Sequence, residues 1–223
     1  MEPFYRKNPR QIVKTIILQN DQKSLVNIQG IELELFSHVY PSQCFRTTNF
    51  LLQNIKNIIN NKVICDMGCG IGIVGQYALY NDAKMVVQAD INFHAIKNAI
   101  ANRKKHQWTT KQCKIYKSDC FDNIPKQIFD VIIFNIPFHS EPYEIHDVVE
   151  YSLFDPNFFT LKKFLFQTKK YSHSKTKIII AFSNKGDIST LEAIFDYYGY
   201  EWKLWKNINQ HKKYDNRLYL LKL

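Results

Sequence analysis

The sequence predicts an α/β fold, in which helices cover a doubly wound, mostly parallel sheet of seven strands with an antiparallel last strand. Two observations predict it. From residue 62 onward, short apolar runs typical of buried strands alternate with segments whose apolar residues recur at helical spacing. Polar side chains also fall at or just past the ends of expected strands, at Asp66, Asp90, Asp119 and Asn135. Ligands bind at the carboxyl ends of strands in such sheets, so these residues mark the expected site.

The elements follow in chain order. Residues 12–18 and 30–36 are expected to be short strands, the second because its apolar and polar residues alternate. Thr47 or Thr48 is expected to cap the first helix, whose apolar face reaches Ile59. The further expected strands are residues 62–67, 85–90, 113–117, 129–134, 176–182, 201–206 and 217–223, and the further helices are residues 73–80, 93–104, 158–171 and 188–198.

The size and composition indicate one globular domain. A chain of 223 residues with 45% hydrophobic content can bury a full core. Because no internal repeat or Gly/Ser-rich linker divides it, we expect a single domain over residues 46–223 behind a short extension over residues 1–45.

The cellular compartment and the range of partners are indicated by sequence features that are absent. No apolar stretch reaches the roughly 20 residues of a membrane span, and the N-terminus lacks the apolar core of a signal peptide. The five cysteines include no Cys-x-x-Cys pair and no zinc-type spacing with His. We therefore expect reduced thiols in a cytoplasmic protein without a metal site or membrane contact. The oligomeric state is not indicated.

Net charge gives a weaker indication of partners. The formal charge of +10 favours polyanions such as RNA, and the C-terminal third holds 13 basic against 6 acidic residues. A solvated lysine-rich surface explains the same numbers equally well, because the lysines are scattered.

A glycine-rich turn follows the strand expected at residues 62–67. Residues 70–75 match the dinucleotide fingerprint G-x-G-x-x-G, so a nicotinamide cofactor has to be considered. Asp66 disfavours it, because a carboxylate at the strand end would repel a pyrophosphate beside it. The same carboxylate suits a ligand whose nearby end carries an ammonium group.

The D-x-G-x-G-x-G pattern at residues 66–72 resembles the first motif of class I S-adenosylmethionine-dependent methyltransferases, which have a Rossmann-like fold. The resemblance implies that S-adenosylmethionine is the cofactor and that Asp66 lies near its amino group. It further implies that the backbone of the loop, at Gly68, Cys69, Gly70 and Gly72, approaches the cofactor closely.

The two following strands extend this resemblance. Asp90 matches the acidic residue that takes both ribose hydroxyls, and Ile91 follows it at the same edge. Asp119 and Cys120 match the segment that binds adenine, with Asp119 facing the exocyclic amine. Taken alone, either aspartate is better explained as a turn or cap residue.

Asn135-Ile136-Pro137-Phe138 closes the apolar run of residues 130–134 and forms a polar corner. The Asn135 side chain and a neighbouring carbonyl, held by Pro137, can accept two hydrogen bonds from one NH2 group, while Phe138 can stack on a flat substrate. The corner therefore suits a planar nitrogen that is attacked in line.

Residues 119–139 narrow the resemblance to the small-domain methyltransferases, which it covers over roughly residues 60–185. These include ribosomal-RNA guanine-N2 enzymes, which read Asn-Pro-Pro-Phe-His, and protein glutamine-N5 enzymes, which read Asn-Pro-Pro-Tyr. The resemblance implies that Asn135, bordering the cofactor as well, and the carbonyl of Ile136 hold the target nitrogen. It implies stacking by Phe138 and gives His139 either a catalytic or a packing role.

Two departures concern the acceptor. Ile136 replaces the usual first Pro, which is expected to loosen the corner and returns one backbone N–H. The segment of residues 140–155 is acidic, and its Glu141, Glu144, Asp147 and Glu150 favour a cationic or peptide-like target over a phosphate backbone.

Residues 39–48 resemble the stretch that forms a lid over the cofactor, which makes the extension a candidate lid.

We therefore expect an N-methyltransferase that acts on a planar nitrogen, in ribosomal or transfer RNA first. A protein glutamine or a small-molecule amine or guanidine is the enzymatic alternative. A non-catalytic RNA-binding or scaffolding module that keeps the fold is the alternative from another class.

Overall fold

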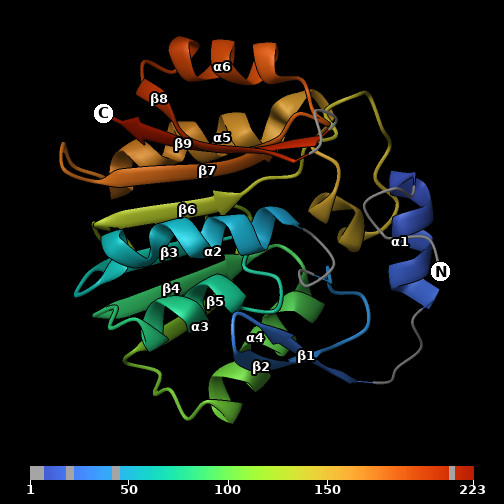
Figure 1. Ribbon diagram of the computed structural model, residues 1–223, viewed down its shortest axis with the longest axis vertical. Coiled ribbons are helices and arrows are strands. Elements are labelled where there is room, and N and C mark those ends of the chain that lie inside the picture. The colour runs from blue at the N-terminus through green and yellow to red at the C-terminus, as the bar shows by residue number, and fades with distance from the viewer. Residues whose placement is uncertain (1–7, 19–22, 42–45, 211–213) are drawn as a thin grey trace.

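The computed structural model describes residues 8–18, 23–41, 46–210 and 214–223. Within these residues, seven strands form one sheet in the order β5-β4-β3-β6-β7-β9-β8 (Figure 1). The strands are β3 (Val63–Met67), β4 (Met85–Asp90), β5 (Cys113–Lys117), β6 (Val131–Asn135), β7 (Lys177–Ser183), β8 (Glu201–Gln210) and β9 (Tyr214–Lys222). Strands β3 to β7 pair in parallel, whereas β9 pairs antiparallel with both β7 and β8. The predicted α/β fold class is confirmed.

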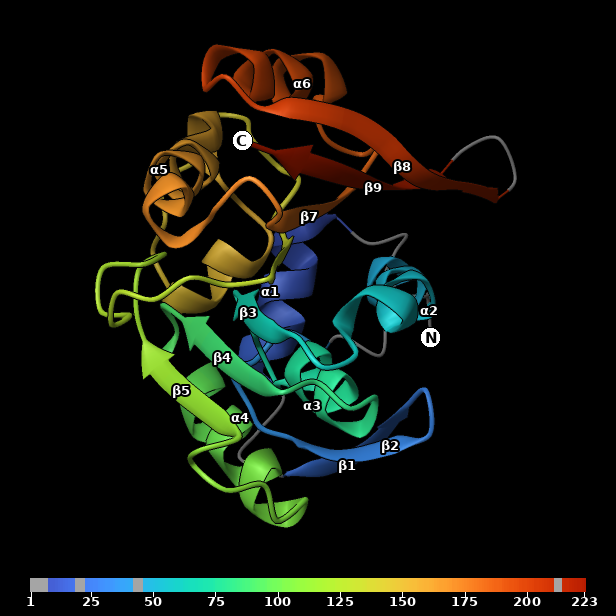
Figure 2. The same ribbon diagram turned by 90° about the vertical axis from the view of Figure 1, so that its left-hand side faces the viewer.

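Helices cover both faces of the sheet. Helices α2 (Arg46–Ile59), α3 (Ile73–Tyr80) and α4 (Phe93–Lys105) contribute to one hydrophobic core, and α5 (Phe159–Thr168) and α6 (Ile188–Tyr197) contribute to the other. Figure 2 shows α2 and α5 on opposite sides of the sheet. The alternation of strands and helices predicted from residue 62 onward is thus confirmed, and the bounds of α3 and β4 agree residue for residue.

The prediction of a strand at residues 12–18 is wrong, because Pro9–Leu18 forms helix α1. Pro9 suits a first helical position, and the Asn8 side chain accepts a hydrogen bond from the Arg10 N–H at 3.0 Å. The β-branched residues that suggested a strand are placed by tertiary packing, which overrides their propensity. Their helical spacing buries them against Val149, Leu153 and Phe154.

Residues 24–35 form a hairpin, of which the sequence predicted only the second strand. Strands β1 (Ser24–Ile28) and β2 (Ile31–Leu35) join through Gln29 and Gly30, which have φ of 53° and 82°. Positive φ at both turn residues is the geometry of a tight hairpin. Side chains of α4 hold the hairpin: Asn98 Nδ2 donates to the Glu34 carbonyl at 2.7 Å.

Two further differences affect the site. Thr47 and Thr48 lie inside the first turn of α2 rather than at its cap, and the Thr47 hydroxyl donates to Asn216 Oδ1 at 2.8 Å. The acidic segment after β6 forms the short 3-10 helices η3 (Val148–Ser152) and η4 (Pro156–Phe158), and η5 (Lys169–Tyr171) extends α5. Figure 1 shows α1 beyond the ends of the parallel strands, on the same side as η3 and η4.

Candidate functional site

A pocket lies at the carboxyl ends of β3, β4, β5 and β6. Ten residues predicted from the sequence line it: Gly68, Gly70, Asp90, Ile91, Asp119, Cys120, Asn135, Ile136, Pro137 and Phe138. Four other predicted residues do not line it: Asp66, Cys69, Gly72 and His139. One pocket therefore brings most of the expected cofactor residues together with the Asn135–Phe138 corner.

The glycine loop between β3 and α3 forms the floor of the pocket. Gly68 has a φ of +64°, and a Cβ there would lie 2.9 Å from Cε2 of Phe134. The Cys69 N–H donates to the Ala89 carbonyl at 3.0 Å, which ties the loop to β4. Gly72, with a φ of 86°, ends the loop at the N-cap of α3. The loop thus needs glycine for its backbone angles and for its close approach to Phe134.

Asp66 supports this loop from inside the protein. Its Oδ2 accepts hydrogen bonds from the Gly75 N–H at 3.2 Å and from Gln88 Nε2 at 2.9 Å. Burial raises the pKa of the Asp66 carboxyl to about 7, against the lowering effect of these two donors. Contact between Asp66 and a cofactor amino group stays a prediction, because the described bonds point to a structural role.

Asp90 is fixed by the backbone at the end of β4. Its Oδ2 accepts from the Gly70 N–H at 2.9 Å and its Oδ1 from the Asn92 N–H at 2.8 Å. Burial raises the pKa of Asp90 although these donors lower it. A carboxylate offers about four acceptor positions, so Asp90 can still accept from a hydroxyl group. Asn92 caps α4 by accepting from the His94 N–H at 2.9 Å, so one turn both begins the helix and orients the carboxylate.

Asp119 lies at the end of β5, where a lysine of α5 orients it. Lys163 Nζ is 2.6 Å from Asp119 Oδ2 and 2.7 Å from Asp122 Oδ2. The neighbouring Cys120 has a φ of 49°, and its Sγ donates to the Thr160 carbonyl at 3.7 Å. Helix α5 therefore sets the position of both predicted adenine-side residues.

The acceptor corner is tied to β7. Asn135 is the last residue of β6, and the Ile136 N–H donates to the Ala181 carbonyl at 3.2 Å. Because Ile136, unlike proline, has a backbone N–H, this bond extends the β6–β7 ladder by one hydrogen bond. The expected loosening of the corner therefore finds no support. The side-chain amide of Asn135 makes no hydrogen bond with any residue that the structure describes. The Phe138 ring packs edge-on to Phe182, with centroids 6.5 Å apart.

His139 packs behind the corner. Its ring centroid is 5.0 Å from that of Phe138 and 5.5 Å from that of Phe154. Burial lowers the pKa of His139, an effect that nearby Glu141 opposes and Lys185 reinforces. Because His139 does not line the pocket, its placement favours the packing role over proton transfer.

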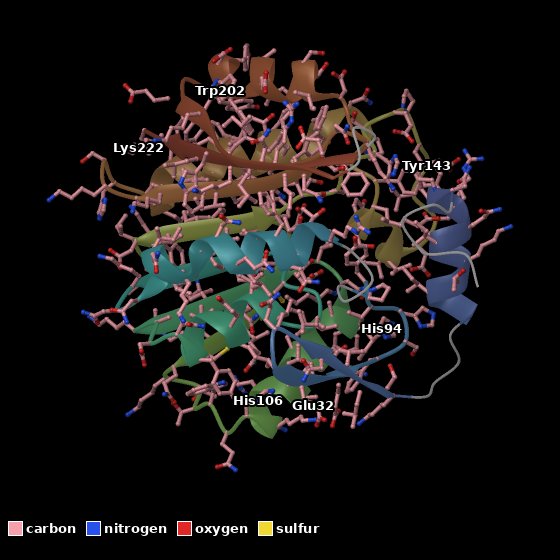
Figure 3. The ribbon with its side chains drawn as sticks, viewed as in Figure 1. Glu32, His94, His106, Tyr143, Trp202 and Lys222 are labelled. Atoms are coloured by element: carbon pink, nitrogen blue, oxygen red, sulfur yellow. The ribbon has the colours of Figure 1, made fainter. Side chains whose placement is uncertain are left out.

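The acidic segment after β6 is less acidic at the pocket than its sequence suggested. Glu150 is buried and accepts from the Tyr143 hydroxyl at 2.8 Å and from the His146 N–H at 2.7 Å. Asp147 caps η3 by accepting from the Val149 N–H at 2.8 Å. Figure 3 shows Tyr143 beside α1. Neither Glu141 nor Glu144 lines the pocket, so the electrostatic objection to RNA applies only outside it.

Part of the pocket wall comes from residues that the sequence did not single out as site residues, although Ser118 lies in the expected adenine segment and Tyr40 and Thr47 in the expected lid. The additional lining residues are Tyr40, Thr47, Met67, Asn92, Ala95, Ser118, Phe134, Val148, Tyr151, Ser152, Phe159 and Thr160. Asn92 could have been found from its place two residues after Asp90, but nothing in the sequence singles out Tyr151 or Phe159. Of the lid expected at residues 39–48, Tyr40 and Thr47 line the pocket, whereas residues 42–45 lie outside the described residues.

Comparison with known families identifies the chain. The methyltransferase small domain model matches residues 35–157, which is more than half of the sequence. The chain belongs to the methyltransferase small domain family. The match contains the glycine loop, Asp90, Asp119 and the Asn135 corner, so the resemblance found in the motifs is confirmed at the level of the family.

Relatives within this family differ in their named substrates. A Methanocaldococcus jannaschii protein named a protein N5-glutamine methyltransferase is 33% identical over 115 residues, 51% of this chain and 54% of its own. A ribosomal RNA large subunit methyltransferase G of Photobacterium profundum is 27% identical over 127 residues, 56% of this chain and 34% of its own. The chain thus spans about half the length of one relative and about a third of the other.

Solved structures share the fold. The Thermus thermophilus 16S rRNA N2 G1207 methyltransferase, solved with AdoMet and guanosine, superposes with a TM-score of 0.63 at 16% sequence identity. The superposition covers 91% of this chain and 50% of that one.

No helix among the described residues has the length and apolar character required to cross a membrane.

Proposed function

We propose that this small-domain methyltransferase moves a methyl group from S-adenosylmethionine to a planar nitrogen of a base in ribosomal or transfer RNA. One observation carries the proposal: Gly68, Gly70 and Asp90 line the same pocket as the Asn135–Phe138 corner. Family membership supports the reaction, and relatives named for ribosomal RNA support the acceptor.

The residues present fit the cofactor. Gly68 and Gly70 line the pocket without side chains, Asp90 keeps acceptor capacity for ribose hydroxyl groups, and Asp119 lies one strand further along the edge. When bound, S-adenosylmethionine supplies a methyl group activated by a positive sulfur. Because that charge is neutralised during transfer, the chain needs no oxyanion hole.

The corner supplies positioning. The Asn135 side-chain oxygen and the Ile136 carbonyl accept the two N–H bonds of the target nitrogen, and Phe138 stacks on its plane. Holding that nitrogen in line with the methyl group uses proximity, the largest rate effect available without a strong base. The proton can leave after transfer, which agrees with the absence of His139 from the pocket lining.

The acceptor side of the pocket is neutral and aromatic. Its lining includes Phe138, Tyr151 and Ser152, whereas the lining carboxylates, Asp90 and Asp119, lie at the cofactor end. A cationic amine or guanidine finds no carboxylate among the described residues at this end, and a desolvated cation is costly without a charged partner. An unpaired base, by contrast, gains from aromatic stacking. The wall therefore favours a nucleobase over a small cation.

A protein glutamine is the second candidate. The Methanocaldococcus jannaschii relative named for glutamine favours it, and a side-chain amide has the same planar NH2 that the corner suits. A non-catalytic module has less support, because the tethered corner and the cofactor residues share one pocket. We also propose a cytoplasmic location, with which the free thiols of Cys65, Cys69, Cys113 and Cys120 agree.

The test is methyl transfer from labelled S-adenosylmethionine to RNA, protein and small-molecule fractions from cells that lack this protein. We expect label in RNA, and no label with an Asn135→Ala variant. Label confined to protein would favour the second candidate. Absence of cofactor binding in calorimetry would overturn both enzymatic proposals.

A further inference from the structure

Helix η3 presents two different faces. Val148 and Tyr151, one 3-10 turn apart, both line the pocket. Val149 and Leu153 point the other way and are 1% exposed, in a core with α1. The segment after the acceptor corner is therefore a wall with a buried back and a front that faces the site.

The structure holds this wall firmly. Glu150 and Asp147 form a capping box at the start of η3, and Glu150 also takes the Tyr143 hydroxyl at 2.8 Å. Behind η3, Ile12 and Ile16 of α1 are 3% and 1% exposed. A short 3-10 helix is weak by itself, so these contacts explain why it keeps one orientation.

Tyr151 is the aromatic side chain that this wall offers to the pocket. It is 38% exposed, and its ring and hydroxyl make no ring contact or hydrogen bond with any described residue. Tyr151 also lies close to the acceptor corner, because the end of its segment is bonded to the residue after Phe138. The Leu153 carbonyl accepts a hydrogen bond from the His139 N–H at 3.2 Å. The pairing His139–Phe154 sets η3 directly beside Phe138.

A second exposed aromatic residue has a different position. Phe159 also lines the pocket and is 70% exposed. It begins α5, where the Thr160 carbonyl accepts from Cys120 and Lys163 holds Asp119. Phe159 therefore belongs to the cofactor end, whereas Tyr151, on η3, lies at the acceptor end beside Phe138.

We propose that Tyr151 is a specificity-determining residue that stacks on the acceptor base, forming a second aromatic wall beside Phe138. The inference rests on the proposed function. It goes beyond that function because stacking on Tyr151 would make the site prefer an aromatic base over the side-chain amide of a glutamine as acceptor. The Tyr151 hydroxyl is free to reach the edge of the base, whereas stacking needs the ring alone.

The test compares Tyr151→Ala, Tyr151→Phe and, as a control, Tyr197→Ala, whose side chain is 84% exposed on α6. Stacking predicts that Tyr151→Ala raises the KM for the accepting RNA fraction about tenfold. Tyr151→Phe and Tyr197→Ala should stay close to wild type. The Kd of S-adenosylmethionine should be unchanged in all three, and thermal melts check folding.

A binding measurement separates stacking from catalysis. Short RNA strands that carry a single base, each of the four bases in turn, are compared with the abasic strand in the presence of S-adenosylhomocysteine. Wild type should prefer one base over the abasic strand, and Tyr151→Ala should lose that preference.

The outcomes are distinct. Equal KM and equal base preference in wild type and Tyr151→Ala, with RNA methylated by both, would overturn this inference alone. A weakened Kd of S-adenosylmethionine with unchanged RNA KM would move Tyr151 to the cofactor end and also overturn it. Methylation of protein only would overturn the RNA acceptor and this inference together.

Discussion

The two halves of the pocket are built in different ways. In the cofactor half, backbone N–H groups of Gly70 and Asn92 hold Asp90. All three lie at the end of β4 or in the loops that follow β3 and β4. In the acceptor half, the wall beside the corner depends on packing between α1 and η3, which are more than a hundred residues apart.

This difference separates local from tertiary information. A glycine loop and its carboxylates form because neighbouring residues fix backbone angles and hydrogen bonds, so a short motif encodes them. The acceptor wall exists only when the N-terminal helix packs onto a distant segment. We infer that relatives can share the first half while their acceptors differ through the second.

The largest effect should come from the corner. Asn135→Ala removes the side-chain acceptor that holds the target nitrogen, so kcat should fall at least about 100-fold. Binding of S-adenosylmethionine should change little, because the cofactor half is built independently. Single-turnover methyl transfer and calorimetry measure the two quantities. A loss of cofactor affinity as large as the loss of rate would show that the halves are not separable.

Asp66 tests whether a motif residue serves the fold. Burial raises its pKa to about 7 from the ordinary 3.8. Between these values the unfolded chain is ionised and the folded one protonated, so the free energy of unfolding falls as pH rises from about 4 to about 7. The slope is on the order of 1.4 kcal/mol per pH unit.

Asp66→Asn cannot ionise and keeps an oxygen for Gly75 and Gln88. The free energy of unfolding of Asp66→Asn, measured in urea, should therefore not fall between pH 4 and pH 7. The variant should match wild type near pH 4 and should be more stable than wild type at pH 8. Asp187→Asn is the control, because hydrogen bonds at the α6 cap lower the pKa of Asp187 to about 2, outside this window. A wild type equally stable at pH 5 and pH 8 would contradict a buried neutral Asp66.

Asp90 tests the cofactor half directly. Asp90→Ala removes the acceptor of the Gly70 and Asn92 N–H groups along with the predicted ribose contact. Since a hydrogen bond to a charged group is worth roughly 1.5–3 kcal/mol, the Kd of S-adenosylmethionine should rise about 10- to 100-fold. Calorimetry measures the change, with exposed Glu144→Ala as control. An unchanged Kd would place the ribose elsewhere.

Prediction from sequence was accurate where local signals were sufficient. The strand ends that carry Asp90 and Asn135 could be located because apolar runs give way there to polar residues. Helix α1 could not, since Ile12 and Ile16 also suit a strand and only packing against η3 decides between the two. The direction of the Asp66 side chain was missed for a similar reason: its partner Gln88 lies on a different strand.

The last comparison concerns two glycines with positive φ. Gly68→Ala and Gly199→Ala both place a Cβ in the left-handed region, at φ of +64° and +72°, which costs roughly 1–2 kcal/mol. Only Gly68 has a neighbour, Phe134 Cε2 at 2.9 Å from the added Cβ, whereas nothing lies within 4 Å at Gly199. Overpacking should therefore add about 1–3 kcal/mol to the loss of stability in Gly68→Ala alone, measured by urea unfolding.

The contact partner explains why this difference matters. The Phe134 ring is already packed against Phe164, with centroids 5.0 Å apart, so it has little room to yield. If Gly68→Ala cost no more than Gly199→Ala, Phe134 would be free to move, and the floor of the cofactor half would be adaptable rather than fixed by its backbone. The contrast between a cofactor half fixed by local backbone geometry and an acceptor half fixed by tertiary packing would then fail. It would fail at the glycine loop, the element on which that contrast depends most.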